Sequence, residues 1–514
     1  MIKKISQHHP RALAVLFFTE LWERFSYYGM QALLVLYMVS ELDFTDNHSY
    51  GIFAAYATLV YVTPIIGGAL SDRYLGCRKA ITLGAVIMAL GHFALAMSHD
   101  ISFYLGLSLL ICGNGFFKPN ISSLLGQLYE HGDPRRDSGF TIFYMGINMG
   151  AFMAPLACGF LGEKYGWHYG FGLAGIGMLA GLIIFRTFAY TIGDHGFPPN
   201  PEKLEKRRYG LTVTNRIYLS LVFLIPAFAL IVYNSEILDS FMPFFLVSLL
   251  GGLIYLAYNS EKHERSNVIT ILVMMFFHSS FWAFMFQMAS SINLYTSRNI
   301  DRVIGGFEVP ATWFLALNPV FIVMLAPIFS FLWVRLGRRN RDPYPPMKFS
   351  FGLLMLSAGF GILALGTTFA DQNGLSPWYW MVIAYFVQTA GEVCVAPVGL
   401  SMVSKLAPAR FSSIFMGIWF IGISCAQYIA GVIARFTSVV PGAAGNIDKL
   451  SSSKIYGEVF SQISVVAVFI ALALLLISPW MRPVFNYEDH GSDEDINEED
   501  EIADEESIAV KAVS

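Results

Sequence analysis

Three charged side chains stand inside one apolar run near the start of the chain. The run extends from about residue 12 to residue 39, which is long enough to cross a bilayer as a tilted helix, and it contains Glu20, Glu23 and Arg24. An unpaired charge near the middle of a membrane costs about 2.5–3.5 kcal/mol on insertion scales. A chain keeps such charges where they pair, face a watery cavity, or move protons and substrates. The segment therefore indicates a transport pathway.

The polar side chains of this helix gather on one face. At helical spacing that face carries Glu20, Arg24, Tyr28 and Gln31, with Glu23 beside it. Glutamates beside an arginine can hold it as an ion pair and release it when a proton reaches a carboxylate. A static ion pair between helices is the alternative. We favour the proton-linked role because ionisable groups inside a membrane are functional by default.

Two further charges lie within apolar helices. Lys118 falls in the cytoplasmic half of its helix, where the alternative to function is a lysine that snorkels from a helix end. Glu392 lies in the middle of another helix, and a lone membrane carboxylate must find a cation or a proton. Arg24 and Lys118 from the first half of the chain and Glu392 from the second would form a bipolar site for a zwitterion. The same three groups could also close into a salt bridge without a ligand.

The elements that position these charges follow from composition. Apolar residues make up 55% of the 514 residues and charged residues 14%, and the mean hydropathy is +0.54, whereas soluble proteins are about 25% charged. The chain is therefore a polytopic membrane protein. We predict an all-α fold with fourteen transmembrane helices, at about residues 12–39, 49–72, 79–98, 101–125, 138–162, 168–190, 214–234, 239–260, 267–292, 311–336, 348–369, 378–404, 411–436 and 456–480.

The basic residues predict the orientation of these helices. If the N-terminus is inside, 24 of the 33 lysines and arginines fall in cytoplasmic segments and six in outer loops. Basic residues concentrate on the cytoplasmic side of membrane proteins. We therefore expect a multi-pass protein of the cell inner (plasma) membrane with both termini in the cytoplasm.

Four domains are expected along the chain. Residues 1–190 would form an N-terminal six-helix bundle, 191–266 a basic cytoplasmic linker with an inserted helix pair, 267–482 a C-terminal six-helix bundle, and 483–514 an acidic tail. The tail is dense in Asp and Glu and nearly free of aromatic residues, so we expect it to be disordered.

Several segments resemble the proton-dependent oligopeptide transporter family of the major facilitator superfamily. Glu20 to Gly29 matches the family's first-helix motif E-x-x-E-R-F-x-Y-Y-G, and Gly67 to Gly76 resembles the superfamily's loop motif. Phe143 to Gly150 resembles the fifth-helix motif, and the surroundings of Lys118 and Glu392 also fit. The resemblance covers about residues 10–480.

This resemblance implies two six-helix bundles around a central site that opens to alternate sides, with an inserted helix pair as in prokaryotic members. It implies that proton coupling depends on Glu20, Glu23, Arg24 and Lys118. Arg24 and Lys118 would receive a peptide carboxylate, and Glu392 the peptide amine. The other expected substrate-binding residues are Tyr28, Tyr61, Asn148, Asn318 and Trp419. Asp72 and Arg73 would form a conformational latch at the cytoplasmic face, or else serve as ordinary topogenic and capping charges.

Two positions depart from the family pattern. Many members carry an arginine where this chain has Gln31, and an acidic residue in the helix at 267–292, where Phe286 follows a Trp-Ala pair. These positions would ordinarily pair across the outer gate. We therefore expect apolar and amide contacts to close the gate in their place.

The sequence thus predicts a proton-coupled symporter that imports di- and tripeptides by alternating access. The alternative is a proton-coupled carrier of another small anionic or zwitterionic solute, such as nitrate or an amino-acid derivative; a channel or an enzyme ranks lower. No catalytic residues, metal site or cofactor are expected, since the proton gradient drives transport. The expected partners are a peptide, protons and lipid, with no nucleic acid, and we expect the protein to function as a monomer.

Overall fold

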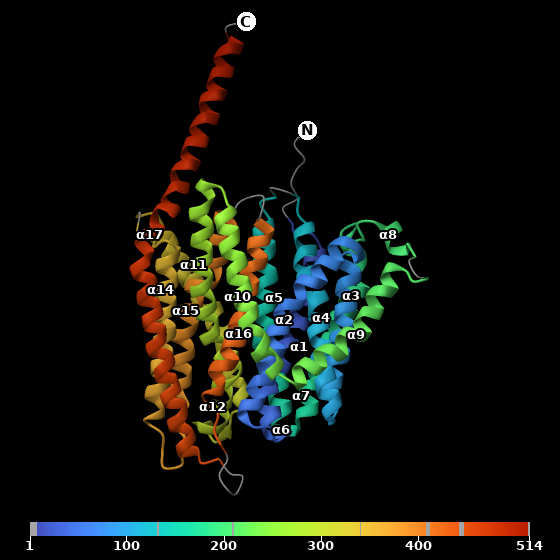
Figure 1. Ribbon diagram of the computed structural model, residues 1–514, viewed down its shortest axis with the longest axis vertical. Coiled ribbons are helices and arrows are strands. Elements are labelled where there is room, and N and C mark those ends of the chain that lie inside the picture. Colours follow the sequence, from blue (N-terminus) through green and yellow to red (C-terminus); the bar gives the residue numbers. More distant parts are fainter. Residues whose placement is uncertain are drawn as a thin grey trace.

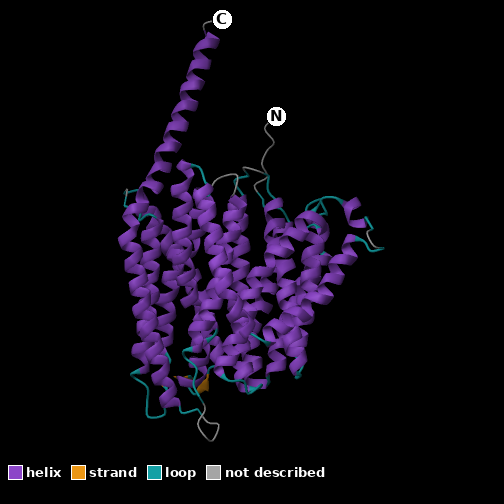
Figure 2. Cartoon of the chain, in the orientation of Figure 1, coloured by secondary structure: helices purple, strands orange, loops and turns teal. Residues whose placement is uncertain are grey.

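The structure, a computed structural model, is almost entirely helical, and its long helices stand side by side (Figures 1 and 2). It describes residues 8–130, 133–207, 210–339, 341–407, 412–440 and 447–511. Within these ranges, thirteen helical segments are long and apolar enough to cross a membrane. The helix that carries Glu20, Glu23 and Arg24 is a fourteenth, so every predicted span is present.

The first group of helices precedes residue 190. It comprises α1 (Ala12–Ser40), α2 (Asp46–Leu70), the π-turn η1 (Ser71–Leu75), α3 (Cys77–Leu95), α4 (Asp100–Gln127), α5 (Arg136–Ala154), η2 (Pro155–Gly159), α6 (Phe160–Tyr165) and α7 (Trp167–Thr187). Helix α1 packs on α5 and α7, and α4 packs on α2 and α3. Pro155 lacks a backbone N–H, and a wide turn there joins α5 to α6 as one bent span.

The second group begins after residue 261. It comprises α11 (Lys262–Met285), η4 (Phe286–Ala289), α12 (Ser291–Asn299), η5 (Ala311–Ala316), α13 (Leu317–Gly337), α14 (Pro345–Thr367), α15 (Tyr379–Leu406), α16 (Ser412–Arg435) and α17 (Lys449–Lys511). Helix α14 packs on α15 and α17, and α16 contacts both α11 and α2. Helices α2 and α16 therefore join the two groups.

A linker and two helices separate these groups. They are η3 (Ala189–Ile192), α8 (Pro201–Glu205), α9 (Val213–Tyr233) and α10 (Glu236–Asn259). Helix α9 packs on α4, whereas Asp239 of α10 lies 2.7 Å from Arg435 of α16. The inserted pair thus contacts both groups from outside, and most of its apolar side chains remain exposed, as lipid-facing residues would be.

The ninth predicted helix, 267–292, differs from the structure at its end. Helix α11 stops at Met285, a short 3₁₀ turn follows, and α12 resumes beyond Ser290, whose backbone lies outside the helical region at φ −119° and ψ −95°. The buried Gln287 amide donates to the carbonyl of Ala430 on α16 as well as to its own helix. This tertiary hydrogen bond accompanies a break that apolar periodicity does not predict.

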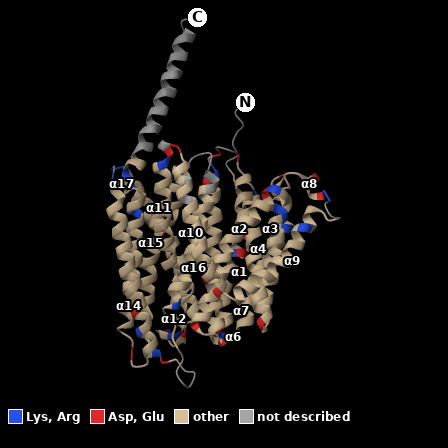
Figure 3. Cartoon of the chain, in the orientation of Figure 1, with Lys and Arg blue, Asp and Glu red and all other residues tan. Residues whose placement is uncertain are grey.

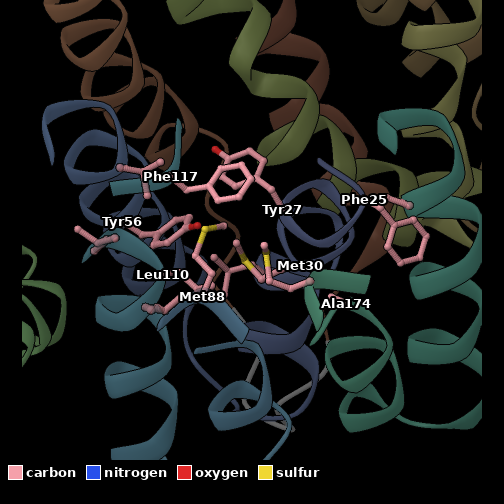
Figure 4. Packing of buried hydrophobic residues seen from close by; sticks show 14 of the residues in the cluster. Phe25, Tyr27, Met30, Tyr56, Met88, Leu110, Phe117 and Ala174 are labelled. Atoms are coloured by element: carbon pink, nitrogen blue, oxygen red, sulfur yellow. The ribbon is translucent and has the colours of Figure 1, made fainter. Parts of the chain in front are cut away.

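Each group of helices has its own apolar core. Figure 4 shows part of the first, where Met30 of α1, Tyr56 of α2, Met88 of α3 and Phe117 of α4 converge. Close helix crossings depend on glycine: a Cβ on Gly67 would lie 2.0 Å from a backbone oxygen of α4. Small residues permit such approaches in membrane bundles.

The two ends of the bundle differ. Both chain termini lie at one end, which we call the terminal end (Figure 1). The opposite end carries short strands, and we call it the hairpin end: β2 (Val303–Ile304) pairs antiparallel with β3 (Phe307–Glu308), and β1 (Ile300–Asp301) pairs in parallel with β4 (Ser376–Pro377). Charged residues gather at these two ends and leave the middle largely uncharged (Figure 3).

Helix α17 continues through the acidic segment to Lys511, whereas the sequence predicted no regular structure after residue 482. No side chain of residues 486–514 is described. The disorder of this tail in solution stays a prediction.

Candidate functional site

Arg24 of α1 is held by the glutamate beside it. Its Nε donates to Oε2 of Glu23 and its Nη2 to Oε1, each at 2.5 Å. Glu23 is fully buried and Arg24 nearly so. Gly150 allows α5 to approach α1 here, since a Cβ on it would lie 3.0 Å from the Arg24 Cβ. A bidentate pair fixes both position and orientation, so the guanidinium is locked.

The second glutamate of α1 reaches a cation on another helix. Nζ of Lys118 on α4 lies 2.5 Å from Oε1 of Glu20, and Nε of Arg24 lies 3.5 Å from the same oxygen. Glu20 is fully buried, whereas the Lys118 side chain is 31% exposed. The other carboxylate oxygen, Glu20 Oε2, is buried without a hydrogen-bond partner. Glu20 is therefore the less completely paired of the two glutamates.

Glu392 of α15 has a neutral partner. Nδ2 of Asn318 on α13 donates to its Oε2 at 2.7 Å and also lies 3.2 Å from Oγ1 of Thr389. Among the described residues, no cation forms an ion pair with Glu392. The three-charge salt bridge that the sequence left open is thus absent: each cation is paired within the first group, and Glu392 stands apart.

A cavity of about 350 Å³ lies between the two helix groups. Its walls are mainly aromatic and apolar, with a few amides and one carboxylate. The residues that line it are Tyr27, Tyr28, Gln31, Ala32, Tyr61, Tyr144, Ile147, Asn148, Ala151, Pro155, Trp282, Met285, Phe286, Met288, Ala289, Leu315, Asn318, Pro319, Ile322, Glu392, Ala396, Ile423 and Gln427. A concave, mostly apolar site with few polar groups is typical of small-molecule binding.

Five of the eight predicted substrate-binding residues line this cavity, namely Tyr28, Tyr61, Asn148, Asn318 and Glu392. Arg24 lies directly behind its wall, because the guanidinium carbon is 4.8 Å from the centre of the Tyr27 ring and 5.9 Å from that of Tyr28. Lys118 is not among the lining residues. Trp419 is buried in the second group, where its ring lies 4.1 Å from that of His278.

A buried ion pair joins the two groups at the hairpin end. The Arg298 guanidinium of α12 donates to both carboxylate oxygens of Asp46, the first residue of α2, at 2.7 Å each. The backbone N–H of Val439 donates to Asp46 as well, at 3.0 Å. The side chains of Arg298 and Asp46 are only 11% and 3% exposed, so water does not substitute for either partner.

Glu163 of α6 makes a second connection at this end. Its carboxylate accepts hydrogen bonds from the backbone N–H groups of Ala311 and Thr312 and from the Thr312 hydroxyl, at 2.7–2.9 Å. The Trp313 indole also donates to the carbonyl of Leu156. Since the first N–H groups of a helical turn lack internal partners, Glu163 caps η5 across the boundary between the groups.

Gln31 and Phe286 are both uncharged, so they cannot form an ion pair. Both line the cavity, where the Phe286 ring lies 5.2 Å from Trp282 and 6.5 Å from Tyr61. An amide contact completes the closure, since Asn293 of α12 donates to the carbonyl of Ala32 at 2.8 Å. Apolar and amide contacts therefore occur there, together with the Asp46–Arg298 ion pair, which was not predicted.

No such connection is present at the terminal end among the residues that the structure describes. Within the described residues, the hydrogen bonds and ion pairs between the two groups lie at the hairpin end or at mid-depth, where Ser424 of α16 donates to the carbonyl of Thr58 on α2. The predicted latch residues, Asp72 and Arg73, are both exposed, and the Arg73 guanidinium lies over the Tyr74 ring at 5.5 Å. Tyr144, on the cavity wall, is 51% exposed. The structure is therefore closed at the hairpin end and open toward the terminal end.

Sequence reasoning missed several of these residues. Asp46, Arg298 and Glu163 were not singled out, because a pairing such as that of Asp46 with Arg298, across 252 residues, leaves no local pattern. Tyr144 lies within the fifth-helix motif, which offered a signal that was not used. Gln427 carries no charge and breaks no pattern, so nothing in the sequence marked it.

Two groups of helices around a central cavity, closed at one end and with buried ion pairs behind the wall, define a membrane carrier. The family model described as the POT family matches residues 78–450 of this chain. The chain belongs to the POT family, which confirms the resemblance seen in its motifs.

The chain is similar in sequence to known transporters over nearly its full length. The chain is 38% identical to the uncharacterized transporter YclF of Bacillus subtilis, over 94% of this chain and 97% of that protein. It is 33% identical to the peptide transporter YePEPT of Yersinia enterocolitica, over 93% and 96%. It is 34% identical to dipeptide and tripeptide permease A of Escherichia coli, over 91% and 92%.

Solved structures show the same fold. A crystal structure of a peptide transporter POT variant in complex with alafosfalin superposes with a TM-score of 0.78 at 35% identity, covering 93% of this chain and 96% of that one. Tetrameric PepTSo2 superposes with a TM-score of 0.80 at 28% identity, covering 92% and 99%. The predicted major facilitator fold with additional helices is thus confirmed.

Proposed function

We propose that this protein is a symporter that imports di- and tripeptides together with protons across the inner membrane. The observation that carries the proposal is the pairing around the cavity: Glu392 stands on one wall without a cation, while Arg24 and Lys118 are held by carboxylates behind the other. An amine and a carboxylate on one small molecule match these two sides. The peptide-transporting relatives support this substrate class.

The distribution of basic residues assigns the terminal end to the cytoplasm. The open cavity then faces inward, and the contacts of Asp46 and Glu163 close the outer side. This is the state from which a peptide would be released. No cofactor takes part, and transport by a single chain stays an expectation.

The pairing suggests an order of events. With the cavity open outward, the peptide amine binds Glu392, and the peptide carboxylate binds Arg24 and Lys118. A proton that reaches Glu20 at its unpaired oxygen removes the charge that holds Lys118, which frees the lysine for the peptide. Closure of the outer side then requires the Asp46–Arg298 pair to form. Loss of the proton inward restores the Glu20–Lys118 pair and releases the peptide.

The first test is proton influx into liposomes that contain the purified protein, on addition of dialanine with an inside-negative potential. We expect influx that depends on dialanine and disappears in Lys118→Ala. Absence of dialanine-dependent influx in folded wild-type protein would contradict peptide symport. Influx with another zwitterion or with nitrate in place of dialanine would favour the alternative carrier.

Glu392→Gln is expected to weaken dialanine binding by about ten- to a hundredfold, because a hydrogen bond to a charged group contributes about 1.5–3 kcal/mol. Equilibrium binding to the purified protein measures this effect. N-acetylated dialanine lacks the cationic amine, so its binding should change much less in the same variant. Equal losses for both ligands, or no loss for dialanine, would show that Glu392 does not receive the amine.

A further inference from the structure

The outer end of the cavity contains polar groups that the proposed mechanism does not use. Gln427 of α16 lines the cavity and is 1% exposed, yet its amide nitrogen and oxygen have no hydrogen-bond partner. The indole Nε1 of Trp282, which also lines the cavity, is likewise buried without a partner. Buried polar groups in folded proteins are nearly always paired, so these two groups on the cavity lining are available to hydrogen-bond a ligand.

Two other amides on the cavity wall, Asn148 and Asn318, behave differently. Asn148 donates to the carbonyl of Tyr144 and Asn318 donates to Glu392. Those two side chains are thus already engaged within the protein. The buried amide of Gln427 differs from these two in that neither its nitrogen nor its oxygen has a partner.

The position of these groups separates them from the charged part of the site. Gln31 lies seven residues beyond Arg24 along α1, about 10 Å nearer the hairpin end. Trp282 and Phe286 also line the cavity, with ring centres 5.2 Å apart and ring planes tilted by 30°. Glu392 is the only charged residue that lines the cavity among those described. The outer end is therefore neutral, with an apolar floor and unsatisfied donors and an acceptor.

We propose that Gln427 and the Trp282 indole N–H form a subsite for a carboxamide group, so that peptides with a glutamine or asparagine side chain bind more tightly than apolar or charged peptides of similar size. The proposal rests on the peptide-binding function above. A carboxamide offers one acceptor and two donors, which complement the Gln427 amide and the indole N–H. A thioether offers neither, and a carboxylate would enter a neutral site without a cation.

The test compares three ligands of similar size, Ala-Gln, Ala-Met and Ala-Glu, in equilibrium binding to the purified protein. We expect wild-type protein to bind Ala-Gln about tenfold more tightly than Ala-Met, as one or two neutral hydrogen bonds would give, and to bind Ala-Glu more weakly than Ala-Gln. Gln427→Leu should remove the difference between Ala-Gln and Ala-Met. Trp282→Phe, which keeps an aromatic ring and loses only the N–H, should reduce it.

Gln388→Leu is the matched control. Gln388 is also 1% exposed with an unpartnered amide nitrogen, but it lies on α15 outside the cavity lining, so the ratio of affinities should stay as in the wild type. Equal affinity of wild-type protein for Ala-Gln and Ala-Met would overturn the proposal, as would an unchanged ratio in Gln427→Leu. If dialanine still drives proton influx in that case, only the subsite is lost; if no peptide binds, the proposed function itself fails.

Discussion

Glu20→Gln should abolish uphill, proton-driven peptide uptake while peptide exchange across the membrane continues. The substitution removes the charge that holds Lys118 at 2.5 Å and leaves a side chain that cannot take up a proton. Exchange needs only binding and reorientation, so we expect it to stay within about fivefold of wild type. Net uptake against a gradient should fall to background, because a side chain that takes up no proton cannot couple the proton gradient to the peptide. Uptake of radiolabelled dialanine into liposomes, with and without a pH gradient, measures both.

Glu23→Gln provides the comparison, because Glu23 binds Arg24 through both of its oxygens. Removal of one partner from a buried ion pair costs about 3–5 kcal/mol, so this variant should impair exchange as well as net uptake. If Glu20→Gln and Glu23→Gln both preserve proton-driven accumulation, the proton-coupling assignment is wrong. If both variants abolish exchange equally, the assignment of different roles to Glu20 and Glu23 is wrong.

Loss of the Asp46–Arg298 pair should open the outer side of the carrier. In Asp46→Asn or Arg298→Gln, the remaining partner stays buried without its counter-charge, which would destabilise the closed outer side by about 3–5 kcal/mol. We expect a thiol reagent added from outside to label Leu315→Cys, a cavity position, at least about tenfold faster in these variants. The five native cysteines are buried, so background labelling is low. Peptide uptake should fall, since release inward requires outer closure.

The double variant Asp46→Asn/Arg298→Gln should be less impaired than the sum of the two single variants, because the effects of substitutions at residues in contact do not add. The matched control is Glu308→Gln. Glu308 also crosses between the groups, lying 3.9 Å from Lys164, but it is exposed, and exposed pairs contribute at most about 1 kcal/mol. Labelling as fast in Glu308→Gln as in Asp46→Asn would refute a specific role for the buried pair.

Several features were readable without the tertiary structure. Apolar runs located all fourteen spans, since a bilayer requires about 20 apolar residues for each helix. The cost of intramembrane charge singled out Glu20, Glu23, Arg24, Lys118 and Glu392 as a group. Glu392 lines the cavity, and the other four form one cluster of ion pairs within the first group. Their roles in coupling and binding stay predictions.

The helix break after Met285 could not be predicted from the sequence. The Gln287 amide that accompanies it bonds to Ala430, which is 143 residues away. The position of Trp419 was also not predictable. Its residue type and family position favour a cavity wall, but its ring packs against His278 within the second group. Such outcomes depend on which face of each helix turns toward the cavity.

The sequence by itself determined that this is a multi-span carrier of the POT family with charged residues at mid-depth, because hydrophobic length, charge cost and motif spacing are local properties. Only the tertiary structure decided which charges pair. Arg24 belongs to Glu23, Lys118 to Glu20 and Glu392 to Asn318, and Asp46 closes the outer side with Arg298. The Arg24–Glu23 pair lies within one helix, but the other three contacts join side chains that come within about 4 Å only when distant helices pack.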